Sequence, residues 1–239
     1  PPSELPTLLA TMAWMSASRL VRRDATGQVT EAAADTAGVG GGTVSWSDDC
    51  GTVLVVSDRT ARLHDGTRAG FEVVGTGSEP PVRGGDVGEV IVDTGTVSRD
   101  GTRVVLGRRV GVSIPIPGVD VSREYLDSYT VLDLVEVVRP GDTLRRIWSH
   151  EGREGGYASA VLWSFLEPAL DRTGARLAVP FGTDVVDQRT TDIGVVLNVR
   201  STLELLLFDL DGGGATSLGA MPLAEDDARY GARRPARFR

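Results

Sequence analysis

Short apolar or alternating segments rich in Val, Leu and Thr, separated by Gly and Asp, extend over nearly the whole chain. Such segments predict antiparallel β-strands, because β-branched side chains suit a pleated surface while Gly and Asp suit the turns between strands. We therefore expect strands at residues 19–23, 27–32, 42–47, 52–57, 61–65, 71–75, 89–97, 102–107, 129–138, 143–149, 158–165, 175–180, 193–198, 203–209 and 215–219.

Helical periodicity is confined to the N-terminal segment 5–20. Apolar residues recur there at helical spacing, at Leu5, Leu8, Leu9, Met12 and Met15. The short, mixed segment around Trp14 also fits an edge strand, so both a helix and a strand stay open for this segment. The remainder of the pattern predicts an all-β chain.

Three segments share one template, in which an apolar strand, a polar turn with Asp and Gly, and a Val- or Leu-rich strand follow one another. They are residues 44–57, 96–107 and 167–180, and we align them on Gly51, Gly101 and Gly174. Asp accepts hydrogen bonds from the backbone two residues on, and Gly takes the positive φ that a tight hairpin needs. Further strands with Asp-Gly turns follow each template, so each unit holds about four strands, as one blade of a β-propeller does.

The Ser-x-Asp-Gly-Thr turn at residues 98–102 and the strand ending Leu-Phe-Asp-Leu-Asp-Gly-Gly at 207–213 resemble the TolB-like and WD40-like bacterial β-propellers, as does the 50-residue spacing of Gly51 and Gly101. The Gly-His and Trp-Asp dipeptides of strict WD40 repeats are absent, so the TolB-like variety fits better. The resemblance implies a propeller of four-stranded antiparallel blades. It specifies no activity, because propellers host binding, scaffolding and catalysis alike.

The repeats divide the chain into successive blades. We expect a partial blade at 1–40, blades at 41–88, 89–156 and 157–220, and an Arg-rich tail at 221–239. These segments make about three and a half to four blades, and closed propellers have at least four. Either the N-terminal segment and the C-terminal tail complete a four-bladed ring, or the chain is part of a larger propeller, and we favour the incomplete propeller. Insertions at 108–128 and 181–192 fall between the second and third strands of their blades. We expect both to be long loops on one face, where function concentrates.

Composition narrows the possible partners and cofactors. All 25 basic residues are Arg, and with 33 acidic residues the net charge is −8, which disfavours a nucleic-acid coat. Cys50 is the single cysteine, so neither an intrachain disulfide nor a thiolate metal cluster is expected. No apolar run reaches the length of a membrane span, and no basic leader is present, which leaves a cytoplasmic or an exported location open.

Motifs that carry chemistry in other proteins have structural explanations in this chain. The glycines at 38–42 precede a strand rather than a helix, which favours a loop over a phosphate cradle. His64 and His150 are the only histidines, and we expect His64 to be a half-exposed strand residue. Asp209-Leu-Asp211-Gly212 begins like a calcium loop, but the positions that follow lack carboxylates, so a hairpin is expected. We predict no catalytic residue, cofactor or metal.

Arginine and tyrosine gather in the first insertion, and this composition is typical of binding hot spots. We predict partner contacts from residues of both insertions, namely Arg108, Arg109, Arg123, Tyr125, Tyr129, Asp184, Asp187 and Arg189. The predicted function is a non-catalytic propeller that presents these loops to a protein or peptide. Two alternatives stay open: the propeller portion of a larger enzyme, such as a peptidase with its catalytic domain outside this chain, and a structural repeat that self-associates to close a ring.

Overall fold

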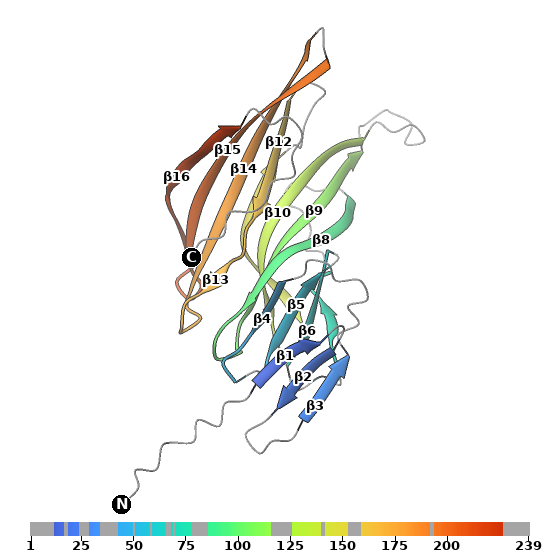
Figure 1. The fold of residues 1–239 in the computed structure, drawn as a ribbon, viewed down its shortest axis with the longest axis vertical. Coiled ribbons are helices and arrows are strands. Elements are labelled where there is room, and N and C mark those ends of the chain that lie inside the picture. The colour runs from blue at the N-terminus through green and yellow to red at the C-terminus, as the bar shows by residue number, and fades with distance from the viewer. Residues whose placement is uncertain are drawn as a thin grey trace, which may run out of the picture.

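In the computed structural model, every regular element of the described residues is a β-strand (Figure 1). The structure describes residues 12–16, 19–23, 29–33, 43–49, 51–57, 59–65, 68, 70–77, 86–115, 126–139, 142–152, 159–191 and 194–226. The prediction of an all-β chain is therefore confirmed.

The strands form four separate antiparallel sheets. The β1–β3 sheet contains β1 (Met12–Ser16), β2 (Arg19–Arg23) and β3 (Val29–Ala33). The β4–β7 sheet contains β4 (Thr43–Trp46), β5 (Val53–Ser57), β6 (Thr60–His64) and β7 (Glu72–Val74). The β8–β11 sheet contains β8 (Asp86–Val97), β9 (Val104–Pro115), β10 (Leu126–Val138) and β11 (Thr143–Gly152). The β12–β16 sheet contains β12 (Ser159–Phe165), β13 (Ala169–Leu170), β14 (Arg176–Thr191), β15 (Gly194–Asp209) and β16 (Gly214–Asp226).

In each sheet the strands pair in chain order, with one interruption. Both β12 and β13 pair with β14, so together they act as one first strand that is broken between Phe165 and Ala169. The backbone N–H of Leu166 still donates to the carbonyl of Pro180 across this break. Successive four-stranded meanders of this kind are the blades of a β-propeller.

Three expectations change in the structure. Residues 12–16 form an edge strand, so the helical alternative for them is wrong. The segments 193–198 and 203–209 belong to the single strand β15. The insertions at 108–128 and 181–192 are largely strand rather than loop, because β9 continues to Pro115, β10 begins at Leu126, and β14 and β15 run to Thr191 and from Gly194.

The last three sheets stack face to face in chain order (Figure 1). One apolar core lies between the β4–β7 and β8–β11 sheets, and a second lies between the β8–β11 and β12–β16 sheets. Successive side chains of β9 pack into the two cores alternately: Val104 and Leu106 lie in the first core and Val105 lies in the second. This alternation explains why the start of β9 is apolar at every position: both of its faces are covered.

Three equivalent turns, which we call the repeat turns, connect the first and second strands of these sheets. They span residues 47–52, 98–103 and 171–176, and each is closed by a 2.9 Å backbone hydrogen bond from its first residue to its last. These hydrogen bonds equate residues 47, 98 and 171, so in the first turn the structural alignment differs by one residue from the sequence alignment on Gly51, Gly101 and Gly174. Gly101 and Gly174 have φ of 72° and 73°, whereas Gly51 has no positive φ and corresponds to Thr102. Counting along the chain, Cys50, which lies outside the described residues, takes the place of Gly101.

Side-chain hydrogen bonds stabilise the second and third repeat turns, but the hydroxyl and the carboxylate occupy exchanged positions in the two turns. In the second turn, Ser98 Oγ donates to Asp100 Oδ1 at 2.6 Å and accepts from the N–H of Arg103 at 2.9 Å. In the third turn the carboxylate comes first, so Asp171 Oδ1 accepts both from the N–H of Arg176 at 3.3 Å and from Thr173 Oγ1 at 3.1 Å. The same backbone is therefore stabilised with the hydroxyl and the carboxylate exchanged.

Candidate functional site

The stacked sheets have two ends of different character. At one end, which we call the turn end, lie the repeat turns and the connections β6–β7, β10–β11 and β15–β16. At the other, the hairpin end, lie the hairpins β5–β6, β9–β10 and β14–β15, of which the β14–β15 hairpin projects farthest in Figure 1. At about 3.3 Å per residue, the 16 residues of β14 extend roughly 50 Å and the 5 residues of β5 roughly 16 Å.

Ion pairs at the turn end join neighbouring sheets to one another. Between the β4–β7 and β8–β11 sheets, the Arg68 guanidinium donates to both carboxylate oxygens of Asp142, at 2.6 and 3.0 Å. These hydrogen bonds, with the nearby Asp65 carboxylate, raise the pKa of Arg68 despite its partial burial. Between the next two sheets, Arg103 pairs with Asp211. These two ion pairs thus help to hold the stack together.

The hairpin end carries ion pairs on strands that extend past the main cores. The first hairpin places Arg59 3.5 Å from Glu89 of β8, with side chains 68% and 67% exposed. On β9, Arg109 lies 3.5 Å from Asp93, and this pair is only partly exposed. An exposed pair such as Arg59–Glu89 contributes little to stability, about 0–1 kcal/mol. They therefore leave charged groups at this end that a partner can engage.

Arg108 is not among those groups, so the expectation that it contacts a partner is wrong. Its side chain is 1% exposed and that of Asp133 is 0% exposed, and the two form a bidentate pair at 2.9 and 2.7 Å. The remaining nitrogen donates to the carbonyl oxygens of Gly75 and Gly77, at 2.8 and 2.6 Å. Arg108 thus fixes the segment that leaves β7 against the β8–β11 sheet, a structural role.

Arg109 points to the opposite face of β9 and reaches Asp93. Asp93 is the extra residue of a β-bulge, because Val92 and Thr94 pair with the adjacent residues Arg108 and Gly107. Burial raises the pKa of the Asp93 carboxyl, and the neighbouring Arg109 opposes that shift. Sequence inspection missed Asp93, because a bulge that turns a carboxylate toward the next strand leaves no motif.

The other predicted residues are placed less completely. Asp184 lies on β14, where its carboxylate accepts a hydrogen bond from Ser201 Oγ of β15. Asp187 and Arg189 follow on β14, and Tyr129 lies on β10, but the structure describes only their backbone. Arg123 and Tyr125 lie outside the described residues. The structure thus brings Asp184, Asp187 and Arg189 onto one hairpin and Tyr129 onto the other.

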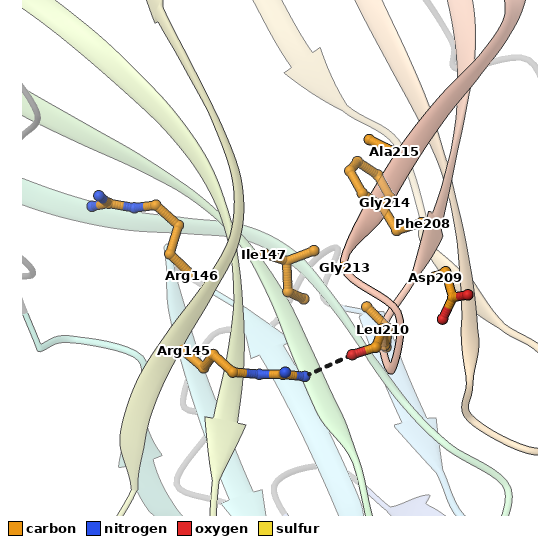
Figure 2. Close-up of a pocket in the computed structure, with 9 residues that line it drawn as sticks. All are labelled: Arg145, Arg146, Ile147, Phe208, Asp209, Leu210, Gly213, Gly214 and Ala215. Carbon is orange, nitrogen blue, oxygen red and sulfur yellow. Dashed lines mark hydrogen bonds between the residues drawn. The ribbon is translucent and has the colours of Figure 1, made fainter.

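One cavity of about 240 Å³ lies at the junction of β11 with the β15–β16 turn (Figure 2). Arg145 reaches across it, donating 3.2 Å to the carbonyl of Leu210, while Arg146 points away from the turn. Arg145 also pairs with Glu136 of β10. Small-molecule sites usually have volumes of 300–1,000 Å³, so this cavity is smaller than a typical ligand site. Because the contacts of Arg145 span it, we interpret it as a packing gap between neighbouring sheets.

The histidines and the expected hairpin have structural roles. His64 is half-buried, and its Nδ1 lies 3.2 Å from the carbonyl oxygen of Gly70. His150 stacks on Trp148 at 5.9 Å between ring centroids, and burial lowers its pKa. The Asp209 carboxylate accepts from the backbone N–H groups of Asp211 and Gly212, which lowers its pKa and confirms the hairpin at this position.

Among the described residues, no group of His, Cys, Asp and Glu has the arrangement of a metal site. The same part of the chain contains no helix long and apolar enough to cross a membrane.

Comparison with known proteins gives remote structural likenesses only. No protein-family model matches the chain, and no curated protein matches it. Among solved structures, the tricorn protease is similar over 84% of this chain, with 10% identity and a TM-score of 0.35, and the chain spans only 24% of that protease. Hydrazine synthase of Kuenenia stuttgartiensis has 12% identity and a TM-score of 0.26, and the match covers 82% of this chain and 72% of the hydrazine synthase chain.

The periplasmic gluconolactonase of Pseudomonas aeruginosa has 14% identity and a TM-score of 0.23, and the match covers 87% of this chain and 77% of the gluconolactonase chain. Likenesses at these scores carry no argument about the chemistry of this chain. The propeller-type fold follows instead from its own strand pairing and sheet stacking.

Proposed function

We propose that this chain is a non-catalytic, TolB-like propeller module that binds a protein partner through its hairpin end. The observation that carries the proposal is the contrast between the two ends. At the turn end, Arg68 and Arg103 are used to join neighbouring sheets. At the hairpin end, β14 and β15 continue well past the core residues Phe181 and Leu206.

Extended hairpins of this length are not needed to complete the core, since the five-residue strands β5 and β6 already bury their apolar side chains. Long projections on a rigid scaffold are where binding residues concentrate. We assign partner contacts to Arg109 and Asp184, whose side chains the structure describes, and to the neighbouring Tyr129, Asp187 and Arg189 on the same two hairpins. Arg123 and Tyr125 are proposed from the sequence of the β9–β10 connection.

The TolB-like assignment is part of the same proposal and is supported by the repeat turn. Its Asp100 and Gly101 have the roles that the sequence pattern predicts, because Asp100 accepts a hydrogen bond from the backbone N–H of Thr102 and Gly101 has a positive φ. The hydroxyl of Ser98 also donates to Asp100. The strand ending in Asp209 with the hairpin that follows adds the second element of the pattern.

A register-preserving deletion tests the proposal. Asp184 and Ser201 are paired across β14 and β15, so residues 185–200 can be replaced by an Asn-Gly turn that joins these two residues. Matched control variants carry Arg99→Ala or Arg172→Ala, which change exposed residues in the repeat turns at the opposite end.

Each protein is immobilised, exposed to extract of the source cells, and the retained proteins are quantified and then tested as purified pairs. We expect at least one protein that the unaltered chain and both turn-end variants retain, and that the shortened variant binds at least about tenfold more weakly. The proposal is overturned if the shortened variant retains the same proteins, or if the unaltered chain retains none above background.

A further inference from the structure

The outward face of the β12–β16 sheet, directed away from the β8–β11 sheet, contains a buried leucine that belongs to no described core. Leu206 and Phe208 of β15 point into the core shared with the β8–β11 sheet, so Leu203 and Ser201 point outward. Leu203 is nevertheless 6% exposed and Ser201 4% exposed. Among the described residues, Leu203 is the one buried apolar residue that lies in none of the apolar clusters.

Neighbours within the sheet do not account for this burial. Leu203 pairs with Gly182 of β14 on one side and with Met221 of β16 on the other. Gly182 has no side chain, and residues that flank an outward side chain within one sheet leave it open from above. A second layer therefore lies over Leu203, and among the described strands no sheet follows the β12–β16 sheet to supply it.

The corresponding face earlier in the stack is covered by the following sheet. In β5, Leu54 and Val56 lie two and four residues after the first repeat turn and belong to the core shared with the β8–β11 sheet. Ala178 and Pro180 occupy the same places after the third repeat turn, and both are only half-buried. In a series of stacked repeats, the last apolar face needs a cap.

The segment that follows β16 is well placed to form this cap. β16 ends at Asp226, and Asp226 pairs with Val199 of β15, four positions before Leu203. Four positions of a strand extend about 13 Å, whereas the residues 227–239 extend up to roughly 43 Å, so this segment reaches Leu203 even after a turn. The connection 153–158, by contrast, has to link β11 to β12 from one sheet to the next.

The composition of 227–239 also suits this position. The segment contains five Arg and one Asp, so it carries +4 on a chain with a net charge of −8 and is attracted to the rest of the molecule. Its Tyr230 and Phe238 offer large apolar side chains. Arg176, on the same face of β14 at the turn end, opposes a basic segment there, which favours the half of the face with Leu203 and Leu205.

We propose that the segment 227–239 folds back onto the outward face of the β12–β16 sheet and covers Leu203 and Leu205. It caps the stack in the place where a further sheet would otherwise pack, so a competing sheet has to displace it. The segment lies on the turn side of Asp184, and the hairpin contacts proposed above stay with the partner.

A chain that ends at Asp226 and a fluorescent peptide of residues 227–239 provide the direct test. We expect the peptide to bind this shortened chain at least about tenfold more tightly than the full chain, because the attached segment competes at a millimolar effective concentration. Anisotropy measures both affinities. Equal binding to the two chains, or no binding to the shortened chain, would overturn the proposal.

A peptide of the same composition in scrambled order separates docking from general attraction to an acidic chain. We expect it to bind the shortened chain at least about tenfold more weakly than the true sequence. Equal binding of the two peptides would show that charge alone is responsible, against the proposal.

Substitutions on the outward face locate the site. In the shortened chain, Leu205→Glu should abolish binding of the peptide, while Leu218→Glu, the same change at a 60% exposed position of β16, should leave it unchanged. Pro180→Glu, at the residue paired with Leu205, gives a second variant in case Leu205→Glu does not fold. Unchanged binding in the folded variants of this face would contradict the assignment.

Protease accessibility tests the same contact in the full chain. Trypsin cleaves after Arg, and Arg229 and Arg233 lie in the segment. We expect cleavage after these residues to be at least about fivefold faster in Leu205→Glu than in the unaltered chain, and unchanged in Leu218→Glu. The same cleavage rate in all three proteins would contradict a docked segment.

Light scattering separates the segment from a second copy as the occupant. We expect the unaltered chain to be a monomer. A dimer that Leu205→Glu dissociates would show that a second copy covers this face, against the proposal.

Discussion

The hydroxyl of Thr52 donates a 3.1 Å hydrogen bond to the carbonyl oxygen of Gly101, 49 positions along the chain and in the next sheet. The Arg139 guanidinium donates to the same carbonyl oxygen. A Cβ on Gly174 would in turn lie 3.2 Å from the Cβ of Ser98. The repeat turns therefore stack on one another, so that each turn positions the next sheet of the series.

Replacing glycine in the repeat turns should destabilise the chain in a defined order. Gly101→Ala imposes a left-handed backbone on alanine and brings its Cβ within 2.7 Å of Thr52 Oγ1, so we expect a loss of more than about 2 kcal/mol. The Cβ of Gly174→Ala would come no closer than 3.2 Å to a neighbouring atom, Ser98 Cβ, so this variant should cost less.

Gly213→Ala is the matched control for that series. Gly213 has φ of 71°, and a Cβ at this position would have nothing within 4 Å, so only the backbone cost of about 1 kcal/mol is expected. Urea unfolding of the three variants gives the order, and an equal loss in all three would show that stacking of the turns contributes no stability.

Removing the buried Arg108 should be far more costly than removing its neighbour. Arg108→Ala leaves the buried Asp133 with only the longer 3.7 Å contact to Arg146 and leaves the carbonyls of Gly75 and Gly77 without their donor, so we expect a loss of about 3–5 kcal/mol. Arg109→Ala, which removes a partly exposed pair with Asp93, should cost about 0–1 kcal/mol. Similar free energies of unfolding for the two variants would refute the structural role of Arg108.

Acid should weaken the second repeat turn through Asp100. Its carboxylate accepts from Ser98 Oγ at 2.6 Å and from the N–H of Thr102 at 3.0 Å, and these bonds lower its pKa in the folded state. A group with a lowered folded pKa stabilises the fold above its unfolded pKa of about 3.9, and that stability is lost as the pH falls through the folded pKa.

Asp100→Asn keeps an oxygen acceptor but removes the charge. We therefore expect the difference in unfolding free energy between the unaltered chain and this variant to stay constant down to about pH 5 and to shrink below about pH 4. A difference that grows as the pH falls would have the wrong sign for this mechanism. Urea titrations at several pH values provide the measurement.

Trp148 should be the most sensitive aromatic residue at the junction of the last two sheets. Its ring meets Phe165, Phe181 and Phe208 edge to face, with centroids 6.0, 5.5 and 6.3 Å away. We expect Trp148→Ala to cost about 3 kcal/mol in thermal unfolding. Trp46→Ala, at an exposed position on β4, serves as the control and should cost less than about 1 kcal/mol. Equal losses would contradict the packing described.

The sequence predicted most strands because their side chains alternate or are fully apolar and because Asp and Gly mark the turns. It misplaced the first repeat turn, because Gly51 matches Gly101 by residue type while hydrogen bonding equates it with Thr102. The register of a turn depends on which backbone N–H closes it. Gly can occur at either of two neighbouring positions in these turns, so the presence of Gly does not identify the register.

The partner-binding site was less predictable than the fold. Arg108 and Arg109 are adjacent in sequence, yet a strand directs them to opposite faces, one into the interior toward Asp133 and one toward Asp93. The insertions were expected to be loops because they fall between the second and third strands of their blades as additions to the repeat. Cross-strand pairing continues through both positions, as the partners Pro115–Leu126 and Asp184–Ser201 show.

The proposal that partner binding uses the hairpin end can be tested by amide hydrogen exchange on the complex of the full chain with the protein recovered by the capture experiment. We predict slower exchange in residues 108–115, 126–131 and 183–199, with the repeat turns at 47–52, 98–103 and 171–176 unchanged. Protection confined to the repeat turns would contradict the proposal and assign binding to the opposite end of the stack.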